Sequence, residues 1–501
     1  GTYQASTGQT SCDDASAGYY VSSTGQTAQT ACAEGTYQAS TGQTSCDDAS
    51  AGYYVADNSY SEIDYDSQKI SSGDYHTCTI IDDGSVSCWG SNGNGQLGDG
   101  TTTQRLSPTQ TSSLGTDRTA IAISAGEAHT CAILDDGSVS CWGDNGYGQI
   151  GDGTTTDRNT PTQTASLGTD RTAVAIAAGE YHTCAILDDG SVSCWGHNGN
   201  GQLGDGTTTD RNTPTQTASL GTDRTAVAID AGNDFTCGIL DDGSVSCWGS
   251  NGNGRLGDGT TTNRDTPTPT SSLGSGRTAI QITTGQSHTC AILDDGSVSC
   301  WGHNDMYGKL GDGTTTARHT PTQTSSLGTG RTAVSIDAGL DHTCTILDDG
   351  SVSCWGGNYF SALGDGTTTS RDAPTPTSSL GTGRTAVSIS GGGQQHTCTI
   401  LDDGSVSCWG SNGNGRLGDG TTTNRDTPTP TSSLGSGRTA AISTIFHAHS
   451  GQTTQTECGL GTYQPDTRQT SCDDASAGYY VDSAGQSSQT ACAAGTYQAS
   501  T

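Results

Sequence analysis

The chain has 501 residues, of which 52 are acidic and only 19 are basic, so its formal net charge at pH 7 is −33. This balance leaves no basic stripe to neutralise phosphates, which excludes nucleic acid as a natural partner. No run of 18 apolar residues occurs, so no membrane span is predicted in this segment. Apolar residues make up 30% of the chain. That fraction alone would favour disorder, but twenty cysteines and strict internal repeats favour a folded, disulfide-stabilised protein.

The N-terminal flank, residues 1–55, and the C-terminal flank, residues 451–501, share a repeated phrase. Gly-Thr-Tyr-Gln begins at residues 1, 35, 461 and 495, and a longer phrase from Thr-Gly-Gln-Thr-Ser-Cys to Gly-Tyr-Tyr-Val occupies 7–21 and 41–55. The pattern resembles the cysteine-rich repeats of ephrin receptors and, more loosely, of tumour-necrosis-factor receptors. Those repeats form rods of small loops joined by disulfides. The second cysteine expected shortly after Cys12 and Cys46 is missing here.

The resemblance also suggests how the flank cysteines pair. If pairing runs across the Gly-Thr-Tyr-Gln phrase, Cys32 joins Cys46 and Cys458 joins Cys472, and the outermost two, Cys12 and Cys492, have no partner in this sequence. We therefore expect a window from a longer array, with a small disulfide-rich rod on each side of the central region.

The central region, residues 56–450, contains one short segment seven times. Its type example is Cys131-Ala-Ile-Leu-Asp-Asp-Gly-Ser-Val-Ser-Cys141, followed by Trp142 and Gly143. A repeat of this length indicates supersecondary units that pack on one another. The copies are spaced by 53, 53, 53, 53, 54 and 54 residues and begin at Cys78, Cys131, Cys184, Cys237, Cys290, Cys344 and Cys398.

Residues 120–164 illustrate how one unit should fold. Apolar alternation and turn residues predict strands at 120–123, 129–134 and 138–142, with a fourth strand around Pro161. Proline confines this fourth strand to a sheet edge. Four short antiparallel strands per unit predict one propeller blade, and no segment has the 3.6-residue period of a long helix.

The Asp-Asp-Gly hairpin turn fixes the register of the second and third strands. A three-residue turn with Gly in the left-handed bulge position puts Cys131 directly opposite Cys141, close enough for a cross-strand disulfide. The turn has the same length in every copy, so it predicts seven disulfides: Cys78–Cys88, Cys131–Cys141, Cys184–Cys194, Cys237–Cys247, Cys290–Cys300, Cys344–Cys354 and Cys398–Cys408.

The glycine-rich phrase after each tryptophan carries a family resemblance. At 195–206 it reads Trp-Gly-His-Asn-Gly-Asn-Gly-Gln-Leu-Gly-Asp-Gly, and it resembles the regulator-of-chromosome-condensation repeat over residues 66–445 or so. The resemblance implies an all-β fold with a closed seven-bladed β-propeller, flanked here by the small disulfide-rich modules. Members of that family include nuclear exchange factors, plant receptor ectodomains and secreted bacterial enzyme inhibitors, so the fold carries little information on function.

Ring closure should place blade seven beside blade one. Lys69-Ile70-Ser71 supplies the leading strand of the first blade, and 439–443 repeats that strand after the last blade without a hairpin of its own. This extra copy either latches the ring by pairing near the N-terminal segment or leads out to the C-terminal flank. We favour the latch, because a ring propeller needs some pairing to join its ends.

Repeated polar residues are better explained by structure than by chemistry. The Asp-Asp-Gly turns could attract calcium, but no calcium loop with a distal glutamate occurs, and turn chemistry explains these residues. Two sets of repeated arginines should pair with the aspartate-rich turns. Six units place histidine before Thr-Cys, but the fourth has Phe235, which a packing position tolerates and a ligand or catalytic base does not: His76, His129, His182, His288, His342 and His396. We expect no cofactor and no enzyme activity.

The units differ mainly in two loops, the one before His-Thr-Cys and the one after Trp-Gly. In a four-stranded meander these two loops lie on the same face of the propeller. Units five and six depart most, with His303-Asn304-Asp305-Met306-Tyr307 and Gly357-Asn358-Tyr359-Phe360-Ser361. Apolar residues on neighbouring exposed loops often mark a contact site, so Met306, Tyr307, Tyr359 and Phe360 are the candidate partner-binding residues. Neutral drift in tolerant loops is the alternative.

Two functions remain open from the sequence. The first is an extracellular structural or adhesive protein, with propeller beads on disulfide-pinned rods in a cell-surface filament, because duplicated repeats lengthen a structure without new chemistry. The alternative is a protein-recognition module, either a receptor ectodomain or a secreted inhibitor, that uses the variable face. Both place the chain outside the cell or at its surface, since this density of disulfides requires an oxidising compartment. Both take protein as the partner, and the first takes neighbouring copies of the chain.

Overall fold

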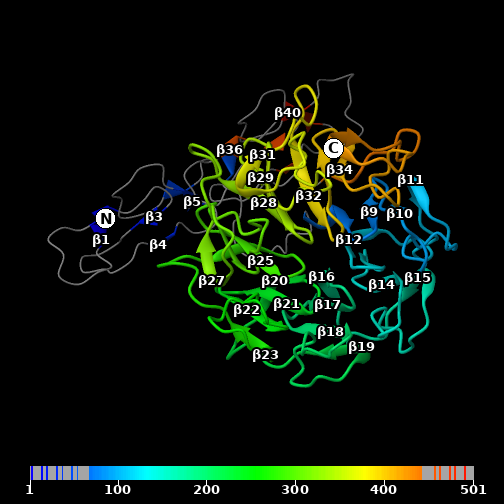
Figure 1. Cartoon of the computed structure of the whole chain (residues 1–501), viewed down its shortest axis with the longest axis horizontal. Helices are drawn as coiled ribbons and strands as arrows, with labels where there is room; N and C mark the ends of the chain where they lie inside the picture. Colours follow the sequence, from blue (N-terminus) through cyan, green and yellow to red (C-terminus); the bar gives the residue numbers. More distant parts are fainter. Residues whose placement is uncertain are drawn as a thin grey trace. The chain divides into compact units, whose positions relative to one another are not determined.

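The computed structural model describes residues 67–442 without a break and, in the flanks, the backbone of short two-residue strands (Figure 1). The chain divides into two compact units, Ile63–His447 and a second unit made of Gly1–Glu62 with Ala448–Thr501. Within 67–442 the one helix is a short 3₁₀ turn, η1 (Ser67–Lys69). No helix among the described residues has the length and apolar character needed to cross a membrane.

Residues 70–430 form seven four-stranded antiparallel sheets, and each sheet is built from four strands that are consecutive in the sequence. The first three blades are β8 (Ile70–Ser72), β9 (His76–Ile80), β10 (Val86–Gly90), β11 (Arg105–Gln110); β12 (Ala120–Ala125), β13 (His129–Leu134), β14 (Val139–Gly143), β15 (Arg158–Gln163); and β16 (Ala173–Ala178), β17 (His182–Leu187), β18 (Val192–Gly196), β19 (Arg211–Gln216). The fourth and fifth are β20 (Ala226–Ala231), β21 (Phe235–Leu240), β22 (Val245–Gly249), β23 (Arg264–Pro269); and β24 (Ala279–Thr284), β25 (His288–Leu293), β26 (Val298–Gly302), β27 (Arg318–Gln323). The sixth and seventh are β28 (Ala333–Ala338), β29 (His342–Leu347), β30 (Val352–Gly356), β31 (Arg371–Pro376); and β32 (Ala386–Gly392), β33 (His396–Leu401), β34 (Val406–Gly410), β35 (Arg425–Pro430).

These sheets are the blades of a closed ring. The first strands of neighbouring blades contact one another all the way round, and β32 of blade seven contacts β8 of blade one. Figure 1 shows the blades following one another from blue through green to orange, with the orange blade beside the blue one. The outermost strand of blade two, β15, contains Pro161 at the sheet edge, as the sequence predicts. The all-β seven-bladed propeller is therefore confirmed.

The hairpin register is the one that the turn length predicts. Cys131 pairs directly with Cys141, and Ile133 pairs with Val139. The two sulfurs are bonded, with the Cα atoms 4.1 Å apart. The same disulfide closes the β-hairpin in all seven blades, at the seven pairs of positions predicted from the sequence.

The hydrophobic core lies between blades, not within one. One cluster joins Ile133, Val139 and the disulfide of blade two to Leu187 and Trp195 of blade three, and all of these side chains are buried. Gly151 shows how close this packing is: its φ is +78°, and a Cβ atom there would lie 2.7 Å from Nε1 of Trp195. Because each interface is thin and apolar residues are few, the disulfide on each blade adds stability that the core alone would lack.

The ring is closed by a composite strand in blade one. Ala440 forms an antiparallel bridge with Ile81, while Ile70 pairs with Thr79 on the same hairpin. The Ala440 N–H donates to the Gly404 carbonyl oxygen at 2.9 Å, and the Ala441 N–H donates to that of Ile80 at 2.9 Å. The chain after blade seven thus latches onto blade one, as we favoured from the sequence.

In the flanks the structure describes six two-stranded pairings. These are β1 (Thr2–Tyr3) with β2 (Asp13–Asp14), β3 (Tyr19–Tyr20) with β4 (Thr30–Ala31), β5 (Thr36–Tyr37) with β6 (Asp47–Asp48), β7 (Tyr53–Tyr54) with β36 (Thr456–Glu457), β37 (Thr462–Tyr463) with β38 (Asp473–Asp474), and β39 (Tyr479–Tyr480) with β40 (Thr490–Ala491). The flank cysteines, including the predicted pairs Cys32–Cys46 and Cys458–Cys472, lie outside the described residues.

Candidate interaction face

The propeller has two faces with different character. The loops between first and second strands and between third and fourth strands lie together on one face, which we call the loop face. The Asp-Asp-Gly hairpin turns lie on the opposite face, which we call the turn face. The predicted binding residues all belong to the loop face.

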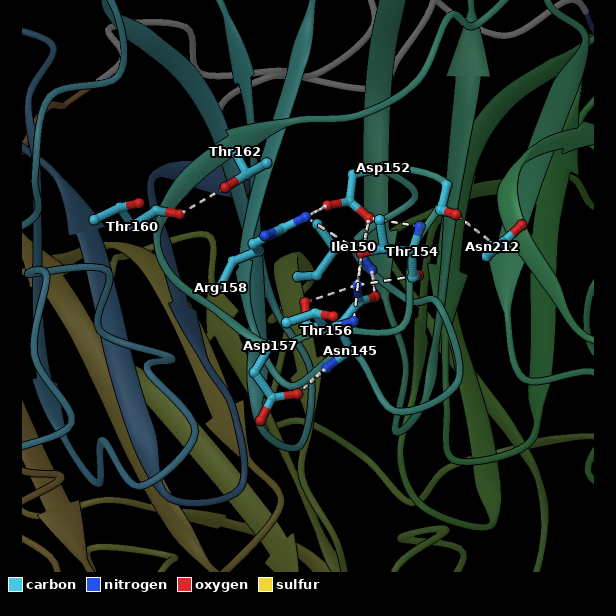
Figure 2. Close-up of polar contacts among 11 residues, drawn as sticks. Asn145, Ile150, Asp152, Thr154, Thr156, Asp157, Arg158, Thr160, Thr162 and Asn212 are labelled. Atoms are coloured by element: carbon cyan, nitrogen blue, oxygen red, sulfur yellow. Dashed lines mark hydrogen bonds and ion pairs between the residues drawn. The ribbon is translucent and has the colours of Figure 1, made fainter.

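A buried asparagine organises each long loop between the third and fourth strands, and Figure 2 shows the one in blade two. In blade two, Asn145 is fully buried, and its Nδ2 donates to the carbonyl oxygens of Thr154 at 3.2 Å and Thr156 at 3.0 Å. Its Oδ1 accepts a hydrogen bond from the Ile150 N–H at 3.0 Å. One side chain thus holds both ends of the loop, so the loop face rests on a fixed base.

The same loop contains a half-buried ion pair. Arg158 Nε donates to Asp152 Oδ2 at 2.7 Å, and Thr154 Oγ1 donates to Asp152 Oδ1 at 2.7 Å. Burial opposes ionisation of Asp152, but the hydrogen bonds from Thr154 and Arg158 outweigh it and lower the pKa of this carboxyl group. This corrects one sequence prediction: the arginines after Thr-Thr-Thr-x pair with the aspartate of Leu-Gly-Asp-Gly or Ile-Gly-Asp-Gly within their own loop and not with the Asp-Asp-Gly turns.

The structure brings the predicted aromatic residues of blades five and six together. The rings of Tyr307 and Tyr359 meet edge to face, with centroids 5.5 Å apart. Met306, Tyr359 and Phe360 are 71%, 61% and 48% exposed. We call these four residues, Met306, Tyr307, Tyr359 and Phe360, the aromatic patch. The loop of blade five is one residue longer than the loop of blade two. Asn304 Oδ1 accepts from the N–H of Leu310, six residues later, whereas Asn145 Oδ1 accepts from the N–H of Ile150, five residues later.

A buried lysine supports the aromatic patch from below. The Lys309 side chain is 1% exposed, and its Nζ lies 2.5 Å from Asp341 Oδ1 of blade six. The same ammonium lies 5.9 Å from the centroid of the Tyr307 ring, within the range of a cation–π interaction. The patch is therefore anchored across the interface of two blades.

A second aromatic cluster, on blades two and three, was not predicted. Tyr147 is 42% exposed, and its ring centroid lies 5.2 Å from that of Tyr181 and 4.7 Å from that of His197. The sequence contained one indication of this cluster: Tyr147 replaces the second asparagine of the Asn-Gly-Asn-Gly phrase that four of the other units have.

Carboxylates gather where the loop face meets the central axis. Burial, and then repulsion from Glu127, raise the pKa of Glu180 to about 7 and that of Asp74 to about 6. Further along the axis, burial and then the charge of Asp337 raise the pKa of Asp230 to about 7. A cavity of about 100 Å³ lies among the first strands and is lined by these residues. Among the described residues, no group of three His, Cys, Asp or Glu side chains has an arrangement that could hold a metal ion.

On the turn face, arginines pair with both aspartates of a turn. Arg118 contacts Asp135 at 3.4 Å and Asp136 at 2.6 Å, and its equivalents repeat this arrangement in the next five blades. In blade one the arginine comes from the other end of the ring, where Arg438 pairs with Asp83. In blades two to seven an arginine thus pairs with both turn aspartates, and in blade one it pairs with Asp83.

The six histidines before Thr-Cys are fully buried and link neighbouring blades. In blade two, His129 Nε2 lies 2.9 Å from Thr183 Oγ1 of blade three. They occupy packing positions, as predicted, and Phe235 is buried at the equivalent position of blade four.

Comparison with known proteins shows which repeats and which solved structures this chain resembles. Two models described as "Regulator of chromosome condensation (RCC1) repeat" match, one at 68–96, 120–149, 173–202, 226–255, 279–308, 333–361 and 386–416, the other at 83–133, 136–186, 189–239, 242–292, 295–346 and 403–453. The yeast RCC1 (Prp20) in a crystal structure bound to Kap60 superposes with a TM-score of 0.63 at 19% identity, over 76% of this chain and 87% of that one.

Curated relatives show how far the similarity extends. The ultraviolet-B receptor UVR8 of Arabidopsis thaliana is 31% identical over 360 residues, which are 72% of this chain and 80% of that protein. The human E3 ubiquitin-protein ligase HERC2 is 31% identical over 342 residues, but the match covers 7% of that protein. The chain therefore belongs to the regulator of chromosome condensation (RCC1) repeat family.

Proposed function

We propose that this chain is an extracellular protein-recognition module whose partner binds the loop face at the aromatic patch. The observation that carries the proposal is the exposure of Met306, Tyr359 and Phe360 on adjoining loops of blades five and six. Exposed apolar residues gathered in one place are typical of contact sites. Aromatic residues at such sites often contribute more than about 2 kcal/mol each when truncated.

The patch also has the rigidity that favours binding. Asn304 and Asn358 are fully buried beneath it, and Lys309 connects Tyr307 to Asp341 of the neighbouring blade. Binding to a preorganised surface avoids the entropic cost of ordering loops. The loop sequences of blades five and six depart from the repeat, which gives the face an individual character that the turn face lacks.

An extracellular setting is supported by the cysteines. Seven disulfides occur in residues 67–442, one in each blade, and disulfides at this density persist in oxidising compartments. Detection of the native protein at the surface of unpermeabilised cells, or in the medium, would support this setting, whereas reduced cysteines in a cytosolic pool would contradict it.

The equivalent loop of another blade supplies a matched substitution for the aromatic patch. Tyr359 and Phe360 occupy the positions of Gly413 and Asn414 in blade seven, so Y359G/F360N converts the loop of blade six toward the repeat sequence and should preserve the fold. A photo-crosslinking residue at 360 of the full chain, presented on native cell surfaces, identifies the partner. We expect Y359G/F360N to weaken capture of that partner at least tenfold and the control Y147N, in blade two, to leave it unchanged. Equal capture by both variants would contradict the proposal.

A second candidate is a structural or adhesive protein whose partner is a neighbouring copy of itself. The repeated phrases of the flanks support it, because they are typical of elongated arrays. Sedimentation velocity and electron microscopy of the native material distinguish the two functions. Polymers that Y359G/F360N disperses would favour the second candidate, and discrete particles that bind a different protein would favour the first.

A further inference from the structure

Two short strands from opposite flanks pair with each other. β7 precedes the propeller in the sequence and β36 follows it, yet Tyr53 pairs with Glu457 and Tyr54 with Thr456 in antiparallel register. Both strands belong to the same compact unit, which contains residues from both flanks. This pairing differs from what we expected from the sequence, which was a separate cysteine-rich module on each side of the central region.

This pairing has the register of an intact repeat. In the N-terminal flank, Tyr19 pairs with Ala31 and Tyr20 with Thr30. In the C-terminal flank, Tyr479 pairs with Ala491 and Tyr480 with Thr490. In all three pairings the second tyrosine of a Gly-Tyr-Tyr-Val phrase faces the threonine two residues before a cysteine.

The sequence around the three pairings shows what differs between them. In the two intact repeats, Gly-Tyr-Tyr-Val is separated from the following Gly-Gln phrase by three residues, 22–24 in one and 482–484 in the other. In the third, Val55 is separated from Gly451-Gln452 by residues 56–450. In the sequence, the whole central region stands where the other repeats have three residues between these two phrases.

The closure of the propeller fits this arrangement. The leading strand of blade one is composite: Ile70 from the N-terminal end pairs with Thr79, and Ala440 from the C-terminal end forms a bridge with Ile81. The two ends of the ring therefore lie on one strand line, beside the same hairpin. A domain inserted into a hairpin turn needs its two ends close together.

From these observations we infer that the propeller is inserted into the hairpin turn of one cysteine-rich repeat, and that the two flanks form a single continuous array. Taken in sequence order, the pairings are β1–β2, β3–β4, β5–β6, β7–β36, β37–β38 and β39–β40. The propeller is then attached to the array at one hairpin and does not interrupt it. The repeats before and after the insertion are then consecutive members of one array, while the propeller retains its own loop face for a partner.

Engineered cysteine pairs in the full chain test the inference. The variant Y54C/T456C should form an intrachain disulfide, detected by peptide mapping without reduction, in a yield within twofold of Y20C/T30C, which has the same register in an intact repeat. The mismatched pair Y20C/T456C, which joins two different repeats, should give a yield at least tenfold lower. Retention of the seven propeller disulfides in each variant shows that the ring has folded.

Each result bears on the inference. If Y54C/T456C crosslinks no better than Y20C/T456C, the flanks are separate and the inference is wrong. If Y20C/T30C itself fails to crosslink, the hairpin register on which the inference rests is wrong as well. Partner binding by the aromatic patch is measured independently, so failure of the proposed function leaves this result unaffected.

Discussion

His129 of blade two donates a hydrogen bond from Nε2 to Thr183 Oγ1 of blade three, across 2.9 Å. The direction follows from the threonine, whose single hydroxyl proton goes to the Gln149 carbonyl oxygen at 2.9 Å. The imidazole is therefore protonated on Nε2, and its buried Nδ1 has no partner. The Gln149 carbonyl oxygen also accepts from Trp195 Nε1 at 2.9 Å, so one backbone atom of blade two holds two side chains of blade three.

Removing the hydroxyl of Thr183 should therefore cost more than removing the imidazole of His129. The variant T183V breaks two buried hydrogen bonds, and an unsatisfied buried polar group costs about 1–3 kcal/mol. The variant H129F recreates the natural arrangement of blade four, where Phe235 occupies this position, and we expect a smaller loss. Denaturant unfolding under oxidising conditions measures both. Equal losses would show that the threonine has no special role.

The buried histidines should make the ring sensitive to acid. Burial lowers the pKa of His129 to about 4, and burial followed by repulsion from nearby positive groups lowers that of His182 to about 3, both from an ordinary value of 6.5. A lowered pKa means that the folded state resists protonation. The stability contributed by the neutral imidazoles is complete above pH 6.5 and is lost as the pH falls toward 3 to 4.

The melting temperature measured between pH 8 and pH 3 tests this dependence. The carboxylates of the loops also titrate near the acid end, so the comparison must be with a matched variant. The variant H129F/H182F should show a shallower fall in melting temperature between pH 6.5 and pH 4 than the natural chain. Parallel curves would contradict the assignment of the acid sensitivity to these histidines.

Much of the propeller could be predicted from the sequence because its elements repeat with constant length. The three-residue turn places Cys131 opposite Cys141, and the same local pattern in seven copies indicates the blades. The link through Gln149 could not be predicted, because only its backbone carbonyl is used. The link itself therefore does not depend on the side chain at this position, which is Arg255 in blade four and Ala362 in blade six.

The candidate site was predictable in part for a related reason. The aromatic patch is formed by the loops of two consecutive blades, five and six, and both loops depart from the repeat sequence. These departures could be recognised in the sequence, so the patch could be predicted. The cluster of Tyr147, Tyr181 and His197 joins three loops of two blades. Tyr181 and His197 lie at positions where several blades carry a different residue. Which variable residues touch depends on the packing of neighbouring blades, which a pattern along the chain does not record.

Ala440 lies near the end of the propeller, but because it closes the ring we expect substitutions there to lower the stability of the whole propeller. Its N–H donates to the Gly404 carbonyl oxygen, and the residue is 1% exposed. Proline at this position removes the donor, and a buried carbonyl oxygen left without its partner costs about 1–3 kcal/mol. We expect A440P and deletion of residues 436–446 to lower the melting temperature substantially. An unchanged melting temperature would show that the latch does not stabilise the ring.

Asp230 should be a source of instability at neutral and higher pH. Its carboxylate accepts from the Thr284 N–H at 2.6 Å, while blades one and two make the equivalent link with Ser71 and Ser124, each accepting an N–H at 2.9 Å. Burial, and then the charge of Asp337, raise the pKa of Asp230 to about 7 from an ordinary 3.8. A raised pKa means that the folded state favours the protonated acid, so stability is lost as the pH rises from 3.8 through 7.

Replacing Asp230 with serine should therefore stabilise the ring at pH 8 and have little effect at pH 4, where the folded carboxyl group is already neutral. D230S keeps an oxygen acceptor for the Thr284 N–H, as Ser71 and Ser124 do for their partners. D230N, which removes the charge and keeps the shape, is the control and should show the same dependence on pH. Melting temperatures at the two pH values measure the difference. A gain of the same size at both would show that shape, and not the buried charge, limits stability at this position.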